Sequence, residues 1–193
     1  PRGALVCGEC AARNGLTAPA PPFASSFNAR ENLPADVTAA TISSASLEVQ
    51  IANGFSFDPI AGGGSLTITI SDGEGGAELG RVVIDGATEA IPAFGRVTRT
   101  LTIGSASIGT TFFASVNVAS VGGQLALIDT SQQITVTTTT TSLLLSSATV
   151  NVSNQSVDLD EVALDVGDID EELTDRIQDG NVILDVVNPF GVS

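Results

Sequence analysis

The stretch Leu66-Thr67-Ile68-Thr69-Ile70 places an aliphatic residue at every second position, with a threonine between each pair. A period of two is typical of a β-strand that buries one face and exposes the other. Threonine and isoleucine are also among the residues that fit a pleated, half-buried surface best. The stretch therefore predicts a half-buried strand.

The same alternation recurs elsewhere along the chain. The apolar positions are Leu47, Val49 and Ile51; Val97, Leu101 and Ile103; and Ala148, Val150 and Val152. Glycine-rich breaks at residues 62–64, 73–76 and 122–123 supply turns between such stretches. Roughly eight to ten strands at spacings of about 8–12 residues predict an all-β fold, an antiparallel Greek-key β-sandwich of the Ig-like or fibronectin-like kind.

The first part of the chain has a different composition. Residues 1–34 contain Pro19, Pro21 and Pro22 next to Phe23, and proline has no amide hydrogen to donate to a sheet. We expect this part to be an extended N-terminal arm outside the core, which docks on a partner. The sandwich domain is then expected at residues 35–175, followed at 176–193 by its final strand or by the start of a second repeat.

The charge balance excludes some partners. The chain has 22 acidic residues against 7 basic ones, for a formal charge of −15, and its arginines form no cluster. Nucleic acids and anionic lipid surfaces are bound through groups of Lys and Arg, so neither is expected as a partner. The weakly charged stretch around residues 100–157 is broken by Ser, Thr, Asn and Gly, and no direct membrane span is predicted.

Most catalytic devices need residues that this sequence lacks. It contains no His, Lys, Tyr, Trp or Met, which removes histidine-based triads, lysine Schiff bases and P-loops. We therefore expect a protein that is not an enzyme. A carboxylate-based hydrolase stays as an alternative, because paired Asp and Glu side chains can cleave glycosidic bonds.

Cys7 and Cys10 form a Cys-x-x-Cys motif. A zinc site needs further thiolate or imidazole ligands, and a redox motif of the thioredoxin kind needs a βαβ context that this sequence does not offer. A small structural disulfide or a pair of free thiols is favoured.

The C-terminal part is acidic. Asp165, Asp168 and Asp170 lie close together in it and are the candidate calcium ligands, since calcium takes 6–8 oxygen ligands. The spacing does not match an EF-hand loop, so a solvated acidic segment with no cofactor is the preferred interpretation.

A run of threonines at residues 137–141 leads into Leu143-Leu144-Leu145. One long strand with an exposed threonine face explains it. An uncharged edge without Lys or Pro would also accept a strand from a partner, which makes Thr137, Thr139 and Thr141 candidate partner contacts together with the prolines and Phe23 of the arm.

Two segments of the chain are similar in sequence. Residues 42–57 align without gaps with residues 177–192, so that Asn53 matches Asn188 and Phe55 matches Phe190. The residues Leu184-Asp185-Val186-Val187-Asn188-Pro189-Phe190 resemble the strand-then-Asn-Pro signature of late-embryogenesis-abundant type 2 (WHy) domains. The resemblance implies an Ig-like sandwich with a binding or protective role and no catalytic residues. Gly54 stands where that signature has proline.

These observations predict a structural or interaction subunit. The chain begins at Pro1 and has no Met, so we expect a processed or partial chain that was exported to the periplasm or the extracellular space. We expect it to dock on, or stabilise, a larger membrane-associated protein complex. A self-assembling filament or surface-layer subunit that exchanges strands is the alternative.

Overall fold

The computed structural model describes residues 2–151, which belong to the first of two compact units, Pro1–Ser153. This part of the chain is built of strands, with one short 3-10 helix, η1 (Gly8–Arg13). The strands are β1 (Arg2–Val6), β2 (Thr17–Pro19), β3 (Phe23–Asn32), β4 (Val37–Asn53), β5 (Ser65–Asp72), β6 (Glu78–Asp85), β7 (Arg96–Ile103), β8 (Ala106–Ile108), β9 (Thr111–Ser120), β10 (Leu125–Leu127) and β11 (Gln133–Val150). The prediction of an all-β protein with antiparallel sheets is confirmed.

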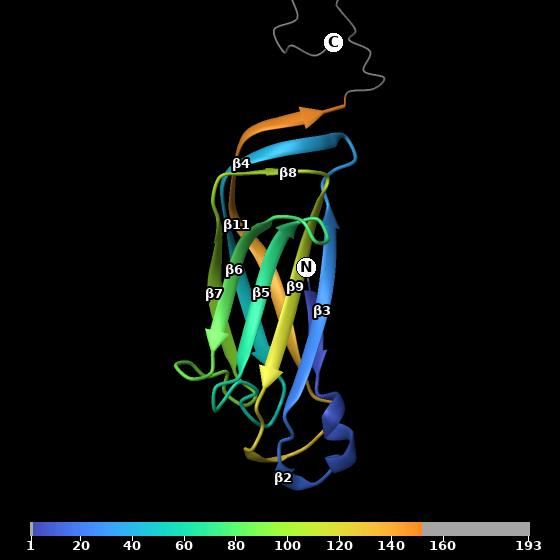
Figure 1. The fold of residues 1–193 in the computed structure, drawn as a ribbon, viewed down its shortest axis with the longest axis vertical. Coiled ribbons are helices and arrows are strands. Elements are labelled where there is room, and N and C mark those ends of the chain that lie inside the picture. The colour runs from blue at the N-terminus through green and yellow to red at the C-terminus, as the bar shows by residue number, and fades with distance from the viewer. Residues whose placement is uncertain (1, 152–193) are drawn as a thin grey trace, which may run out of the picture. The chain divides into compact units, whose positions relative to one another are not determined.

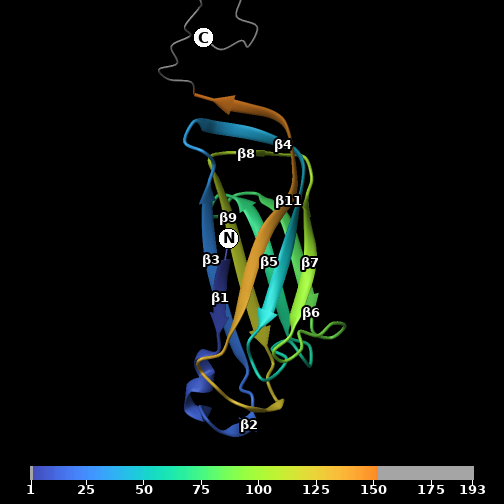
Figure 2. The ribbon, with the colours of Figure 1, turned by 180° about the vertical axis from the view of Figure 1, so that it is seen from behind.

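Two main sheets carry the fold. The first has the strand order β1-β11-β4-β7, with β8 paired to β4, and the second has the order β3-β9-β5-β6. Every pairing in both sheets is antiparallel. A separate two-stranded sheet joins β10 to β2. Figure 1 shows β5 and β9 in front of β4 and β11, and Figure 2 shows the same two layers from behind.

The core lies between these layers because the alternating apolar side chains of both sheets face each other. Leu66, Ile68 and Ile70 of β5 are buried, as are Val49 and Ile51 of β4. The threonines between the β5 residues lie on the other face and are partly exposed. The alternation read from the sequence thus corresponds to one buried face in each sheet.

Residues 2–32 differ from the predicted arm, because their strands β1 and β3 belong to the two main sheets. β1 pairs with β11 from Arg2 against Thr137 to Val6 against Gln133, and β3 pairs along its whole length with β9. Leu5 is fully buried in the core. A segment with such a ladder and such burial is part of the fold, and the boundary expected at residue 34 is not a structural boundary.

Three phenylalanines explain how the proline-rich stretch is held. The ring of Phe23 meets the rings of Phe55 and Phe57 edge-on, with centroids 5.8 Å and 6.4 Å away. Gly123 donates a backbone hydrogen bond to Ala20 at 2.8 Å, and Ala20 donates one to Gln124 at 2.7 Å. Pro19 ends β2, and Pro21 and Pro22 lie in the short connection from β2 to β3, where the backbone of Ala20 is bonded to the loop before β10.

The strands β4 and β11 form a long ribbon that continues past the second sheet. Figure 1 shows their far halves beyond the end of β5, where they bend over β8. Register shifts interrupt the β11–β4 ladder between Thr140 and Ser142 and at three later places, and such bulges bend a strand. The predicted strand at residues 148–152 exists up to Val150, but its side chains from Ser142 to Val150 are exposed and not half-buried.

Several expectations concern residues 152–193 and lie outside the described residues. These are the calcium candidates Asp165, Asp168 and Asp170, the last part of the expected sandwich domain, and the segment 177–192 that is similar to residues 42–57. Within residues 2–151, the single helical element, η1, is too short and too polar to cross a membrane.

Candidate protein interaction surface

One side of β11 is only partly covered. β1 pairs with it from Gln133 to Thr137, while β4 pairs with its other side along nearly the full length. Among residues 2–151, no strand pairs with the β1 side of β11 beyond Thr137. Residues 138–150 of β11 are therefore called the open edge.

The open edge is uncharged and in part aliphatic. β11 contains no Asp, Glu, Lys or Arg from Gln133 to Val150, and no proline. Leu143, Leu144 and Leu145 are 50%, 63% and 48% exposed. Charged side chains, proline and bulges are the usual devices that keep an edge from pairing with another chain, and this edge has only the bulges.

An apolar groove lies beside the open edge, between the two sheets. Thr140 and Leu143 of β11 form one side, and Ala29 of β3 with Phe113 of β9 form part of the other. The groove has a volume of about 160 Å³, and among the described residues Glu31 is the one charged residue of its lining. Its walls can therefore accept an apolar group of modest size.

β1 closes the seam between the sheets just beside this groove. The Val6 amide donates to Ser25 Oγ of β3 at 3.2 Å, while β1 pairs with β11 on its other side. Gly3 faces the ring of Phe27, and a Cβ atom there would come within 2.2 Å of a ring carbon. Thr138 follows Thr137, the residue of β11 that pairs with Arg2. Its Oγ1 is buried and has no hydrogen-bond partner among the described residues.

The predicted threonine contacts have different surroundings. Thr137 pairs with Arg2 of β1 and with Gln50 of β4, so it is covered on both sides. Thr139 is exposed on the open edge. Thr141 is exposed at a bulge, and its Oγ1 donates to the Ser46 carbonyl at 2.9 Å. The structure thus places Thr139 and Thr141 on the open edge, beside the three leucines.

The predicted contacts of the arm lie elsewhere. Phe23 is buried at 4% exposure and Pro21 is buried, while Pro22 is exposed. Pro19 pairs with Leu125 in the small sheet. These residues lie near β2 and β10. Phe23 and Pro21 are covered by the fold itself, whereas Pro19 and Pro22 are exposed and stay candidate partner contacts.

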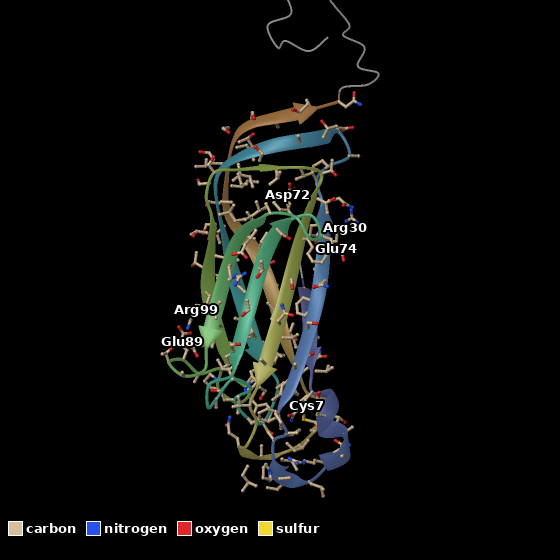
Figure 3. The ribbon with its side chains drawn as sticks, viewed as in Figure 1. Cys7, Arg30, Asp72, Glu74, Glu89 and Arg99 are labelled. Carbon is tan, nitrogen blue, oxygen red and sulfur yellow. A yellow bond between two sulfur atoms is a disulfide. The ribbon has the colours of Figure 1, made fainter. Side chains whose placement is uncertain are left out.

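Cys7 and Cys10 are joined by a disulfide, and both are buried. The bond lies directly after β1 and encloses the start of η1 (Figure 3). Packed in this way, it holds the turn that follows β1 of the first sheet and leads through β2 to β3 of the second sheet.

The described carboxylates are mostly exposed, and several of them form ion pairs or hydrogen bonds on the surface. Glu89 forms an ion pair with Arg99 (Figure 3), and Glu78 forms one with Arg81 at 2.6 Å. Hydrogen bonds from the hydroxyl and amide of Ser131 lower the pKa of Asp129 below its usual value. Within residues 2–151, no group of three or more His, Cys, Asp or Glu side chains could hold a metal ion.

Sequence reasoning missed the groove. Its lining residues are ordinary Ala, Phe, Ile and Leu positions drawn from both sheets, and only the packing of the sheets brings them together. The uncharged run before the three leucines was the one local signal that pointed to this end of the molecule.

Comparisons of the chain with protein-family models, curated proteins and solved structures gave no match. The resemblance to WHy domains therefore stays a prediction.

Proposed function

We propose that this chain is a non-catalytic structural subunit of an extracytoplasmic protein assembly, and that it contacts other subunits through the open edge of β11. The observation that carries the proposal is the exposure of Leu143, Leu144 and Leu145 on an uncharged edge that no strand of residues 2–151 pairs with. Contiguous exposed apolar side chains next to unpaired backbone groups mark a protein contact more often than a free surface.

The energetics favour a protein partner at this edge. Each leucine would remove about half of its side-chain surface from water on contact, which is worth roughly 1 kcal/mol. Backbone groups of a partner strand would add hydrogen bonds of about 0.5–1.5 kcal/mol each. Several such terms together can offset the entropy lost on association.

We also propose that the fold is an Ig-like Greek-key sandwich. An Ig-like Greek-key sandwich is supported by the two antiparallel sheets and by connections that cross between them, such as β4 to β5 and β6 to β7. Export is supported by the buried Cys7–Cys10 disulfide, since such bonds persist in oxidising compartments.

Two kinds of assembly fit this surface. The first is a larger membrane-associated complex, in which the chain docks as an extrinsic subunit. The second is a filament or surface layer that grows by strand exchange, and the open edge favours it as well, because an unpaired edge can propagate pairing from copy to copy.

The test is the native state of the protein in its source cells. We expect the chain to migrate in a fixed-stoichiometry complex, and Leu144→Asp to release it as a monomer with an unchanged melting temperature. The matched control is Leu125→Asp, at a residue that is 73% exposed on β10. A monomeric wild-type chain would contradict the proposal, and open-ended fibres under the electron microscope would select the filament.

The hydrolase alternative has its own test. Glycan-cleaving activity that disappears on mutating one Asp or Glu would establish it. Absence of turnover on a panel of glycans would retire it.

A further inference from the structure

We infer that the end of the molecule formed by β2 and β10 inserts shallowly into the surface of a zwitterionic lipid bilayer. Four exposed apolar residues lie at this end and are called the apolar tip: Leu16, Pro19, Leu125 and Leu127. The tip is separate from the open edge of β11, so the inference goes beyond the proposed function. Four observations carry it: the continuity of the tip, its position in the fold, its lack of charge and its satisfied backbone.

The apolar tip is a continuous patch on a small sheet. Leu125 and Leu127 are 73% and 54% exposed, and the buried Ala126 between them shows that both lie on the outer face of β10. Pro19 of β2 is exposed and lies directly opposite Leu125 in the ladder. Leu16, which is 56% exposed, comes directly before β2. Apolar side chains that gather on an exposed surface in this way mark a contact site.

The exposure of the tip does not depend on where the first or the last described strand stops. β1 runs toward the tip, because η1 and β2 follow it, and the antiparallel β11 runs away from the tip after β10. Figure 1 places β2 at the opposite end of the molecule from the far half of β11. A continuation of either strand would therefore extend toward the other end of the molecule.

The chain segments that form the tip are uncharged. Residues 14–29 and 100–128 contain no Asp, Glu, Lys or Arg, although the whole chain has 22 acidic residues. Moving a charged group from water into apolar surroundings costs much free energy, so an uncharged end is suited to enter a bilayer. The formal charge of −15 disfavours an anionic lipid surface, and a zwitterionic bilayer is the surface that remains.

The backbone at the tip is largely satisfied within the protein. Proline has no amide hydrogen, and three of the seven residues 16–22 are prolines. The Ala20 amide donates to the Gln124 carbonyl at 2.7 Å, and the Pro19 carbonyl accepts a hydrogen bond from the Arg13 guanidinium. Backbone groups that enter hydrocarbon need such partners inside the protein, because lipid tails offer none.

The size of the tip favours a bilayer over a protein partner. A stable protein interface uses about 20–30 residues on each side, whereas the apolar tip has four. A bilayer needs no complementary surface, and apolar side chains bind to it by entering about 5–10 Å into the boundary between headgroups and acyl chains. A single myristoyl chain binds bilayers reversibly, with a constant of about 10⁴ M⁻¹. We expect the tip to bind no more strongly than that.

The experiment uses the full chain and vesicles of phosphatidylcholine. The sequence contains no Trp, so Leu125→Trp places a single fluorescent reporter in the tip. We expect its emission to shift to shorter wavelength when vesicles are added, with half of the change at about 0.1–1 mM lipid. The matched control is Val83→Trp, at a residue that is 50% exposed on β6, and its emission should not shift.

Charge substitutions test the same surface without a reporter. Leu127→Asp should weaken vesicle binding in a flotation assay at least about tenfold, or 1.4 kcal/mol. Leu16→Asp should weaken it as well, which keeps the inference testable if Leu127→Asp fails to fold. Val83→Asp should leave binding unchanged.

Several results would overturn the inference. They are an unchanged emission of Leu125→Trp on adding vesicles, equal shifts in the two Trp variants, or equal vesicle binding by Leu127→Asp, Leu16→Asp and the wild type. Short-wavelength emission of Leu125→Trp before lipid is added would show that protein covers the tip, from the same chain or a second copy, and would reject the bilayer.

The bilayer contact and the proposed function can fail separately. Leu144→Asp should still bind vesicles, while Leu125→Asp should lose vesicle binding and stay in the complex. Vesicle binding that fails while the complex persists rejects only the bilayer contact.

Discussion

Asn53 is a buried side chain that ties three segments together. It is 3% exposed, and its Nδ2 lies 2.9 Å from the Phe57 carbonyl, 3.0 Å from that of Ile91 and 2.9 Å from that of Pro92. Its Oδ1 accepts a hydrogen bond from the Phe55 amide at 2.9 Å. The amide group thus fixes the end of β4 against the loop that leads into β7.

Replacing this amide should destabilise the fold. We expect Asn53→Ala to lower the free energy of unfolding by about 1–3 kcal/mol, because buried carbonyls would lose their donor. Asn28→Ala, at an exposed position of β3, should change it by less than about 0.5 kcal/mol. Urea unfolding of both variants measures the difference, and equal stability would show that Asn53 is not a structural tie.

Asp129 offers a test of local electrostatics. Its carboxylate accepts hydrogen bonds from the Ser131 hydroxyl at 2.7 Å and the Ser131 amide at 2.9 Å, which lower its pKa. A lowered pKa in the folded state means a contribution to stability that is present above the unfolded-state pKa and is lost as the pH falls through the folded-state pKa.

Removing the hydroxyl should reverse part of this shift. In Ser131→Ala we expect the pKa of Asp129 to rise toward its ordinary value, because the first and largest cause is gone. A carbon-detected NMR titration of the Asp129 carboxyl follows the change. Thr130→Ala, which leaves both hydrogen bonds in place, should not move the pKa, and an unchanged value in Ser131→Ala would refute the assignment.

At the scale of elements, β1 shows that the N-terminal residues belong to the core. Leu5 is fully buried, whereas its neighbour Val6 is 50% exposed. We expect Leu5→Ala to cost about 2–5 kcal/mol of stability, as for other large buried aliphatic residues. Val6→Ala should cost far less, and thermal unfolding of the two variants decides whether β1 is structural or, if both are neutral, an arm after all.

The prediction of an N-terminal arm is wrong, and part of the reason can be recognised in the sequence. Prolines at positions 19, 21 and 22 pointed to an extended segment, but Pro19 ends the short strand β2 and the other two occupy the short connection to β3. Directly after them, Phe23, Ser25, Phe27 and Ala29 alternate toward the core, with Phe23 buried. That spacing was a strand signal. The pairing of β1 could not be read in the same way, because five residues carry little pattern and their partner lies far along the chain.

Other elements were readable because their pattern is strong. β5 alternates buried aliphatic residues with threonine over most of its length, and β7 does so from Thr100 to Ile103. In β4, Val49 and Ile51 are buried and alternate with the exposed Glu48 and Gln50. β11 was readable as a strand, but the exposure of its far half depends on where the second sheet ends. No local pattern encodes that limit.

At the scale of the whole molecule, the surface proposed for function arises from two unequal sheets. The paired strands β4 and β11 extend beyond the end of the opposite sheet. β1 pairs with only the first residues of β11. The groove, with Ala29 from one sheet and Leu143 from the other, exists only once the sheets have packed. The uncharged threonine run predicts an edge strand from the sequence alone. Which strands lie beside that edge, and that a groove lies next to it, can be seen only in the three-dimensional structure.

Amide hydrogen exchange tests the central claim most directly, when the isolated chain is compared with the same chain in its native assembly. In the isolated chain, the outward amides of residues 138–144 have no partner strand within residues 2–151, and we expect them to exchange fast. In the assembly we expect their exchange to slow at least about tenfold, which corresponds to roughly 1.4 kcal/mol, while β5 stays unchanged. Equal exchange rates at residues 138–144 in both states would contradict the claim that this edge is the contact surface.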